Sequence, residues 1–328
     1  MKAEPTPNRR EDRLVFTGLC AFPLTPLTGD NVDEAALVRL VNRAADAAVD
    51  SIGVLGSTGI YTYLRREERR RAVEAAVEAA RGIPVVAGVG AMRTRDVREY
   101  VDDAQTAGAS GLLLAPVSYQ RLTDDEVYGL YREVSAASDL PVAVYDNPAT
   151  TGFTFTDELH GRIAELPGIA SIKFPPPALG QASDRIAQLR AAVPGSVSLG
   201  ISGDWAAAEA LLAGCDAWYS VIAGLFPKAA KVIVEHAAAA RQHGGQTGQG
   251  SGQTGQGSSL EAAALQASAV LEPVWALFRT YGSLRVVATM AEVLGFVEAP
   301  CLPRPLQSLG SEGHVKVEEA LRLSGLGA

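Results

Sequence analysis

The sequence has few of the residues on which disulfide frameworks and metal sites depend. Its three cysteines, Cys20, Cys215 and Cys301, are odd in number and far apart along 328 residues. This spacing fits a reducing compartment better than a disulfide framework, and no two cysteines are spaced like a pair of metal ligands. The four histidines show no H-x-H or H-E-x-x-H spacing, which disfavours a metal-dependent enzyme. They are His160, His236, His243 and His314.

Excess positive charge and long apolar runs are also missing. The net charge of -8 and the pI near 5.2 argue against nucleic-acid binding, which needs a dense positive field. No run of about 18 apolar residues occurs, and the polar N-terminal segment lacks the apolar region of a signal peptide. We therefore expect a cytoplasmic protein with no membrane or nucleic-acid partner. With 47% hydrophobic residues, the chain is long enough for one large domain.

Lysine is scarce compared with arginine, and one lysine has an unusual setting. The stretch "SIKFPPP" (171–177) places Lys173 between an apolar run and three prolines. A cation needed only for solubility would more commonly be arginine in this chain, so Lys173 calls for a specific explanation. The other lysines are Lys2, Lys228, Lys231 and Lys316.

Short β-rich apolar runs alternate with longer segments of helical period, which indicates a parallel sheet. Eight such units fit in about 225 residues, and no G-x-G-x-x-G follows the first strand. The pattern therefore predicts an α/β fold, a (β/α)8 TIM barrel with a C-terminal helical extension. The expected strands are 14–22, 51–56, 83–90, 110–116, 140–147, 169–174, 196–202 and 215–222.

Composition divides the chain into four parts. Residues 1–13 are expected to form a flexible segment, 14–240 the barrel, 241–259 a flexible loop and 260–328 helices packed on the barrel. The loop contains a tandem "GQTGQGS" repeat without an apolar residue, which cannot bury anything. Helices are expected to begin near Asp33, Arg66, Thr94, Thr123, Thr156 and Asp204, with Asp33 and Thr123 as N-caps. C-terminal helices are expected near 260–280, 283–295 and 312–325.

The ends of the barrel strands should carry the chemistry, because active sites of such barrels lie at the carboxyl ends of the strands. Period-two alternation puts Ser171 and Lys173 on one face of their strand and Ile172 and Phe174 on the other. If the apolar pair faces the helices, Lys173 points into the barrel, where desolvation favours the neutral amine that attacks a ketone. The alternative is an interior lysine paired with a carboxylate.

Two other strand ends support the catalytic interpretation. Tyr145 ends the neighbouring strand, where its phenol could carry protons, although a buried structural tyrosine is common. "GSTG" (56–59) offers two hydroxyl groups and backbone amides suited to a carboxylate. Such turns are ordinary loops when taken alone, so the turn is informative only beside Lys173 and Tyr145.

Four motifs together resemble the dihydrodipicolinate synthase/N-acetylneuraminate lyase family, which consists of class I, Schiff-base-forming aldolases on a (β/α)8 barrel. The resemblance covers about residues 14–325, and the joint order and spacing of the motifs make it specific. The motifs are Gly56-Ser57-Thr58-Gly59, the segment from Tyr145 to Gly152, the pair Ile172-Lys173, and Ser202 to Asp204.

The resemblance implies a Schiff base between Lys173 and the carbonyl of a 2-oxo acid such as pyruvate. It implies that Tyr145 and Ser57 relay protons and that no metal or organic cofactor is needed. Thr58 would hold the carboxylate of the 2-oxo acid. The substrate-binding residues expected on this basis are Thr58, Gly59, Thr150, Gly203 and Tyr219.

Departures from the family pattern concern the outer pocket. Family members that make dihydrodipicolinate carry an arginine where this chain has Thr150, so lysine biosynthesis is not expected. Ile60 replaces the usual glutamate, and the family's second tyrosine, which can enter a neighbouring subunit's site, falls at Ser118 or Tyr119. Tyr219 could narrow the pocket or offer a hydroxyl group, and a packing role is an equal alternative.

Two functional hypotheses follow. The first is a Schiff-base lyase, either an aldolase or a dehydratase, that acts on a 2-oxo acid such as pyruvate or on a 2-keto-3-deoxy sugar acid. The second is a non-catalytic protein that binds a 2-oxo acid or a sugar acid on the same barrel, suggested by the changes at Thr150, Ile60 and Ser118. Arg93 and Arg95 could bind a distal carboxylate, but such arginines are usually solvated. The resemblance also implies a homo-oligomer, either a dimer or a tetramer.

Overall fold

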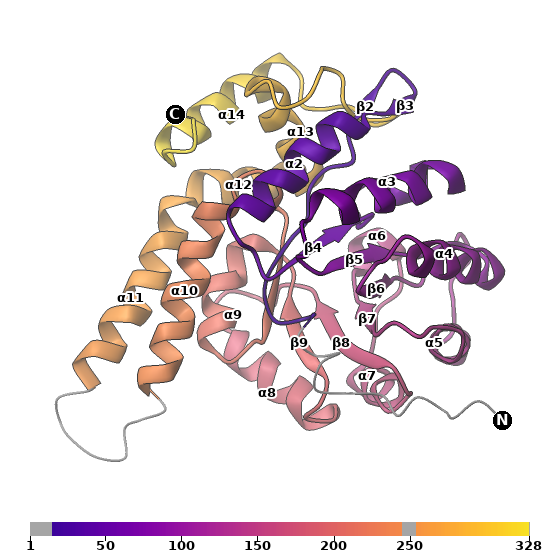
Figure 1. Cartoon of the computed structure of the whole chain (residues 1–328). Helices are drawn as coiled ribbons and strands as arrows, with labels where there is room; N and C mark the ends of the chain where they lie inside the picture. The colour runs from indigo at the N-terminus through magenta and orange to yellow at the C-terminus, as the bar shows by residue number, and fades with distance from the viewer. Residues whose placement is uncertain (1–14, 245–253, 328) are drawn as a thin grey trace.

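The computed structural model of the chain describes residues 15–244 and 254–327 and shows a closed, eight-stranded parallel barrel (Figure 1). The strands follow one another around the barrel in the order in which they occur along the chain, and β10 pairs with β1 to close it. The predicted barrel and all eight predicted strands are therefore confirmed. The barrel strands are β1 (Gly18–Ala21), β4 (Ser51–Val54), β5 (Val85–Gly88), β6 (Gly111–Leu114), β7 (Val142–Tyr145), β8 (Ile169–Phe174), β9 (Ser198–Ile201) and β10 (Ala217–Ser220).

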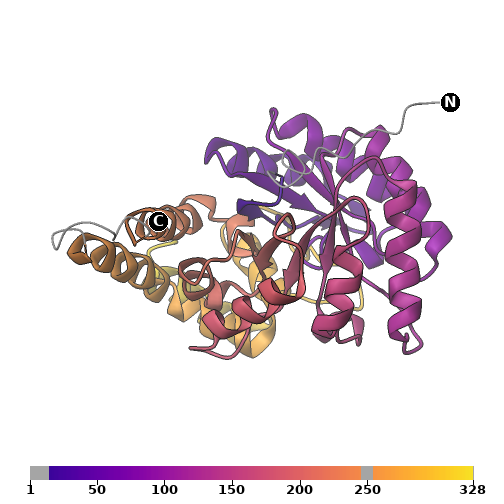
Figure 2. The ribbon, with the colours of Figure 1, turned by 90° about the horizontal axis from the view of Figure 1, so that it is seen from below.

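Helices surround the barrel and connect successive strands, as the view from below shows (Figure 2). Asp33 accepts from the Ala36 amide at 2.8 Å and caps the first of them, and Thr123 caps another in a reciprocal pair with Glu126. Both predicted N-caps are confirmed. The connecting helices are α2 (Glu34–Asp46), α3 (Arg66–Ala79), α4 (Thr94–Thr106), α5 (Asp124–Ala137), α6 (Pro148–Thr151), α7 (Asp157–Ala164), α8 (Ala182–Ala192) and α9 (Ala207–Leu212).

Two short strands outside the barrel were not expected from the sequence. β2 (Leu27–Thr28) and β3 (Asn31–Val32) form an antiparallel hairpin after β1. The Leu27 amide donates to the carbonyl of Cys301 at 3.0 Å. This bond joins the hairpin at the carboxyl end of β1 to the C-terminal region.

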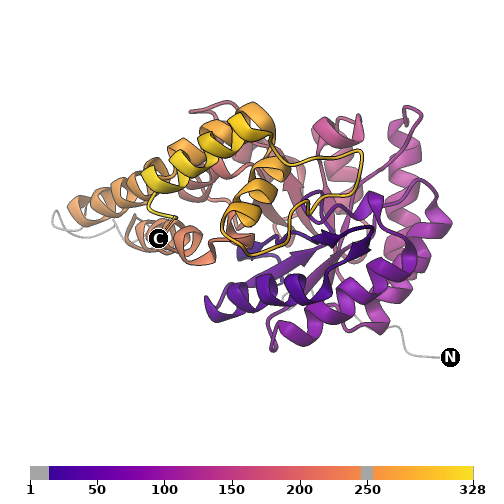
Figure 3. The ribbon, with the colours of Figure 1, turned by 90° about the horizontal axis from the view of Figure 1, so that it is seen from above.

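The C-terminal region is helical and begins with an arm that extends away from the barrel. α10 (Pro227–Gly244) and α11 (Thr254–Val270) lie side by side in this arm (Figures 1 and 3). Both helices run into the segment 241–259, which was expected to be a loop, so that range was too wide. The rest of that loop and the N-terminal segment 1–13 lie outside the described residues. In the described part of the chain, no helix has the length and apolarity needed to cross a membrane.

The predicted helix at 260–280 is in fact two helices. α11 ends at Val270 and α12 (Glu272–Tyr281) begins two residues later, with Pro273 in its first turn. Proline cannot continue a preceding helix because its nitrogen has no hydrogen to donate, but it fits the first turn of a new one. The other two helices, α13 (Ser283–Val293) and α14 (Ser311–Leu323), confirm the remaining C-terminal prediction.

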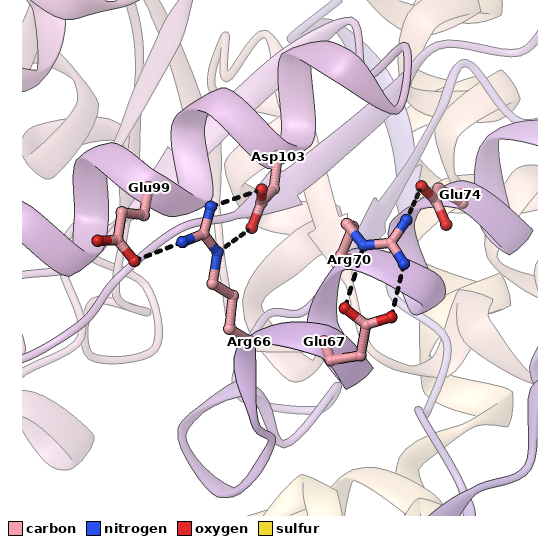
Figure 4. A network of polar contacts seen from close by, with 6 residues as sticks. All are labelled: Arg66, Glu67, Arg70, Glu74, Glu99 and Asp103. Carbon is pink, nitrogen blue, oxygen red and sulfur yellow. Dashed lines mark hydrogen bonds and ion pairs between the residues drawn. The ribbon is translucent and has the colours of Figure 1, made fainter.

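Ion pairs on the outer surface link α3 to α4 (Figure 4). Arg66 of α3 contacts Glu99 at 2.6 Å and Asp103 at 2.7 Å, both on α4. Arg70 bridges Glu67 and Glu74 within α3. These side chains are exposed for the most part, so each pair contributes little to stability, roughly 0 to 1 kcal/mol. This network is therefore part of the solvated outer surface of α3 and α4.

A different polar cluster lies buried between β7 and its neighbouring helices. Asp146 follows β7 and is 4% exposed, and its carboxylate oxygen lies 3.5 Å from Nε2 of the fully buried His160 on α7. Burial raises the pKa of Asp146 to about 7, while Arg185 opposes this rise and Asp157 adds to it. Burial and Arg185 lower the pKa of His160 to about 4. Between about pH 4 and pH 7 both groups are therefore largely uncharged.

Several groups face this pair from the surrounding helices. Asp157 on α7 contacts both His160 and Arg185 of α8. Tyr131 of α5 is fully buried, and this burial raises the pKa of the phenol, with a smaller contribution from Asp146. The carboxyl group and the imidazole have opposite effects on how the stability changes as the pH rises. Between about pH 4 and pH 7 the folded Asp146 holds a proton that the unfolded chain has lost, whereas the folded His160 lacks a proton that the unfolded chain holds below pH 6.5.

Replacing the buried carboxyl group alone should remove its contribution to the pH dependence of stability. We expect Asp146→Asn to gain stability relative to the wild type as the pH rises from 5 to 8, by about 2 kcal/mol, because an amide has no ionisation to suppress. Urea unfolding at several pH values measures this difference. Glu158→Gln removes an exposed carboxylate from α7, the helix that carries His160, and serves as the control. A pH-independent difference between Asp146→Asn and the wild type would contradict the prediction.

Candidate active site

Lys173 lies inside the barrel near the carboxyl end of β8. The side chain is 4% exposed. Its strand neighbours Ile172 and Phe174 belong to the core between the strands and the helices, as alternation predicts. The lysine amine therefore lies in the barrel mouth, where substrates of such barrels bind.

Three aromatic rings surround the amine. Its Nζ lies 4.0 Å from the ring centroid of Phe22, 4.1 Å from that of Tyr145 and 5.4 Å from that of Tyr219. Among the residues that the structure describes, no carboxylate lies within ion-pair distance of Lys173. The described residues therefore do not support the alternative of an interior lysine paired with a carboxylate.

Tyr145 is held beside Lys173 by the register of the sheet. The two residues are direct partners across β7 and β8, and the Asp146 amide donates to the carbonyl of Lys173 at 2.9 Å. Tyr145 is 6% exposed, and its hydroxyl donates to Oγ of Ser57 at 3.3 Å. The structure therefore brings together the three residues that the sequence suggested for catalysis, Lys173, Tyr145 and Ser57.

The turn after β4 holds Thr58 and Gly59 in a confined space. Thr58 is 6% exposed. A Cβ atom at Gly59 would lie 2.8 Å from the Leu55 amide nitrogen and 3.2 Å from Oγ1 of Thr25. Any larger residue would displace this backbone, so the tight turn itself requires glycine. Ile60, which follows, adopts a left-handed conformation with φ of 50°.

A buried guanidinium binds the end of the neighbouring strand β5. Arg69 of α3 donates to the carbonyl oxygens of Gly90 at 3.1 Å and Gly88 at 2.9 Å. Its guanidinium carbon lies 3.6 Å from the ring centroid of Tyr100 and 5.4 Å from that of Tyr61. Burial lowers the pKa of Arg69 to about 10, which leaves it charged at neutral pH. Arg69 thus joins α3 to the end of β5 and packs against Tyr61, which follows the turn.

The motif at the end of β9 joins the loop after Lys173 to the next strand. Gly203 has a φ of +88°, and a Cβ atom there would lie 2.6 Å from the ring of Pro176. Asp204 accepts from Nε1 of Trp218 at 3.0 Å and from the Ile222 amide at 2.6 Å. Burial raises the pKa of Asp204 to about 6, while these bonds and the charge of Lys173 oppose the rise. Gly203 therefore packs closely against the loop after Lys173, and Asp204 ties the end of β9 to β10 and to the turn that follows it.

Tyr219 lies deeper in the barrel and is fully buried. Its hydroxyl is 2.6 Å from Oγ of Ser171, and its ring packs edge-on against Phe22 with centroids 6.1 Å apart. Since the hydroxyl already has a buried partner, these contacts favour the packing alternative for this residue. Tyr219 forms part of the floor beneath Lys173.

Other residues considered from the sequence lie outside this centre. Thr150 is exposed on α6, and its hydroxyl donates to the carbonyl of Asn147 at 3.3 Å. Tyr119 is 90% exposed and Ser118 is half-buried. Arg95 is exposed and pairs with Asp96 at 3.0 Å.

Three residues near the site were missed by sequence reasoning. Phe22 contacts Lys173 from the end of β1, but a phenylalanine at the end of an apolar run carries no distinctive signal. Asp146 and Asn147 directly follow Tyr145, and Nδ2 of Asn147 donates to the Tyr145 hydroxyl at 2.9 Å. The sequence signal that could have identified Asp146 and Asn147 was the presence of two consecutive polar residues immediately after a buried strand.

Comparison with known proteins agrees with this geometry. The sequence matches the dihydrodipicolinate synthetase family over residues 15–323. A 4-hydroxy-tetrahydrodipicolinate synthase from Phenylobacterium zucineum is 36% identical over 160 residues, which cover 48% of this chain and 54% of that relative. The enzyme of the same name from Methylococcus capsulatus is 34% identical over 206 residues, which cover 62% of this chain and 69% of that relative. The chain thus aligns with about half of the first relative and two thirds of the second.

Solved structures extend the likeness to nearly the whole chain. The crystal structure of a dihydrodipicolinate synthase from Agrobacterium tumefaciens is 43% identical, with a TM-score of 0.87, and the match covers 95% of this chain and 99% of that one. A chloride-inhibited dihydrodipicolinate synthase from Acinetobacter baumannii, complexed with pyruvate, is 25% identical with a TM-score of 0.81 over 95% and 99% of the two chains. The chain therefore belongs to the dihydrodipicolinate synthetase family of class I aldolases and lyases.

Proposed function

We propose that the protein is a Schiff-base lyase that acts on a 2-oxo acid such as pyruvate or on a 2-keto-3-deoxy sugar acid, and that it is not an authentic dihydrodipicolinate synthase. The observation that carries this proposal is the buried amine of Lys173 beside Tyr145, without an ion-pair partner among the described residues. Pyruvate is present in the complex of the Acinetobacter baumannii relative, which supports a substrate of this class.

In the proposed reaction, the Lys173 amine attacks the C2 carbonyl carbon of the 2-oxo acid. A C–N bond forms, one proton passes from the amine nitrogen to the carbonyl oxygen, and a second proton lets that oxygen leave as water, which leaves a protonated imine. The Tyr145 hydroxyl and Ser57, which are 3.3 Å apart, provide the path for these protons. Removal of a C3 proton gives an enamine, and its carbon either attacks an aldehyde or, in reverse, is released from one.

The turn after β4 fits the role of a carboxylate site in this scheme. Thr58 is buried in a tight turn in which only glycine fits at position 59. A hydroxyl group and backbone amides held in a tight turn can bind a carboxylate without rearrangement. A substrate held there by its carboxylate would present its neighbouring carbonyl carbon to Lys173.

The outer pocket argues against aspartate semialdehyde as the second substrate. The position at which the synthases carry an arginine for the semialdehyde carboxylate is Thr150, which is exposed and hydrogen-bonded to the backbone of its own turn. Threonine cannot pair with a carboxylate as a guanidinium does. We also expect the protein to act as a homo-oligomer, which sedimentation measures directly.

Removing the lysine amine should abolish the chemistry. We expect Lys173→Ala to reduce the exchange of pyruvate C3 protons with D₂O by at least about 10³-fold, because no imine can form to acidify them. Proton NMR follows the loss of the methyl signal, and circular dichroism checks the fold. Lys228→Ala, which removes an exposed lysine of α10, is the matched control and should exchange at the wild-type rate. An active Lys173→Ala would overturn the proposed function, whereas saturable pyruvate binding by the wild type without exchange would favour the non-catalytic alternative.

Adding the missing guanidinium should improve the use of the semialdehyde. We expect Thr150→Arg to raise kcat/KM for aspartate semialdehyde with pyruvate by about tenfold or more, since a charged hydrogen bond contributes about 1.5 to 3 kcal/mol. Ala149→Arg adds the same charge one residue away and should have a much smaller effect. If the wild type already condensed the semialdehyde faster than uncharged aldehydes, our exclusion of a synthase role would be wrong.

A further inference from the structure

The Tyr145 hydroxyl has two partners within its own chain. It donates to Oγ of Ser57 at 3.3 Å, and it accepts from Nδ2 of Asn147 at 2.9 Å. Ser57 comes from the turn after β4, whereas Asn147 follows Tyr145 itself by two residues. The phenol oxygen is thus held from two sides at the barrel mouth.

The direction of these bonds follows from the number of protons available. A phenol has one hydrogen to donate. If that hydrogen points to Ser57, the contact with Asn147 requires the amide N–H₂ to be the donor. The amide group therefore occupies a lone pair of the phenol oxygen and leaves the phenol hydrogen directed toward Ser57.

The backbone of Asn147 is fixed independently of this contact. Its carbonyl oxygen accepts from the amide of Thr150 at 3.1 Å and from the amide and hydroxyl of Thr151, each at 3.0 Å. These bonds form the first turn of α6, which Asn147 precedes as the N-cap residue. The side-chain amide thus starts from a fixed backbone and loses little freedom when it reaches Tyr145.

No other side chain takes this place in the structure. Tyr119 is 90% exposed and Ser118 is half-buried. Within the residues described, Ser57 and Asn147 are the side chains hydrogen-bonded to the Tyr145 hydroxyl. The described part of the chain therefore supplies one hydroxyl group and one amide to the phenol oxygen of Tyr145.

We propose that Asn147 is a positioning residue for the proton relay, and that the relay of Ser57, Tyr145 and Asn147 is complete within one subunit. This inference rests on the proposed function. When Tyr145 passes on its proton, negative charge develops on the phenol oxygen, and a bond from a neutral donor to a charged acceptor is stronger than one to a neutral acceptor. The amide of Asn147 thus stabilises the state in which the proton has left, and it acts on the rate rather than on substrate binding.

Removing the amide donor should lower turnover without weakening binding. We expect Asn147→Leu to reduce kcat for the deuterium exchange of pyruvate about 10- to 100-fold, as the loss of a hydrogen bond to a charged group implies, with KM within about twofold of the wild type. Asn147→Asp, which keeps the shape but puts a non-donating oxygen in place of the amide, should lose a comparable factor. Wild-type kcat in either variant, or a loss expressed mainly in KM, would overturn the proposal.

A double-mutant cycle with Tyr145→Phe tests whether Asn147 acts through the phenol. In the Tyr145→Phe background there is no hydroxyl to hold, so Asn147→Leu should cause no further loss of exchange activity. The same fractional loss in both backgrounds would show that Asn147 acts through another group and would contradict the assignment. Single-turnover measurements at high enzyme concentration keep the slow variants measurable.

Completeness within one subunit is tested at the two positions that could supply a group from a neighbouring subunit. Tyr119→Phe and Ser118→Ala should exchange pyruvate protons at the wild-type rate, and a tenfold or greater loss in either variant would contradict this part of the proposal. A wild-type protein that exchanges the C3 protons of neither pyruvate nor any of a panel of larger 2-oxo acids would overturn the proposed function itself. An active wild type with an unaffected Asn147→Leu would overturn only the role of Asn147.

Discussion

The burial of one amine among three aromatic rings is the constraint on which the rest of the site depends. Lys173 can point into the barrel because β8 places Ile172 and Phe174 against the helices, and it meets Phe22, Tyr145 and Tyr219 there. A lysine at this depth without an ion-pair partner in the described residues loses hydration and gains in return the weaker attraction of ring faces and of the more distant Asp204. Such an arrangement is costly for stability alone and is useful when the amine reacts.

The strands around Lys173 make room for the rings that surround it. A Cβ atom at Gly53 of β4 would lie 2.3 Å from the Phe22 ring, and one at Gly200 of β9 would lie 2.0 Å from the Tyr219 ring. Glycine on each of these two strands therefore leaves room for the two rings, which form the floor beneath the amine. The wall is formed by Tyr145, whose place is set by direct pairing with Lys173 across β7 and β8. The pairing of the barrel strands and the packing of the rings thus together determine the position of the amine.

Period-two alternation and strand ends were sufficient to predict the barrel and the buried position of Lys173 beside Tyr145 from the sequence. Lys173 and Tyr145 could be found because each follows an apolar run at a predictable end of a strand, and Asp33 and Thr123 because caps have a local chemical signal. Asn147 and the Asp146–His160 pair could not be assigned in this way. Their roles depend on distances across α6, α7 and β7, and these distances are set by tertiary packing. The break at Leu271 could have been read from Pro273, since proline in a helical pattern marks a new start.

Borohydride reduction of the wild-type protein in the presence of pyruvate tests the central claim most directly. Reduction converts an imine into a stable secondary amine, so intact mass and peptide mapping identify the residue that carries the adduct. The account predicts one reduced pyruvate per chain, attached at Lys173. An adduct at another lysine, or no adduct with pyruvate and with a panel of larger 2-oxo acids, would contradict it.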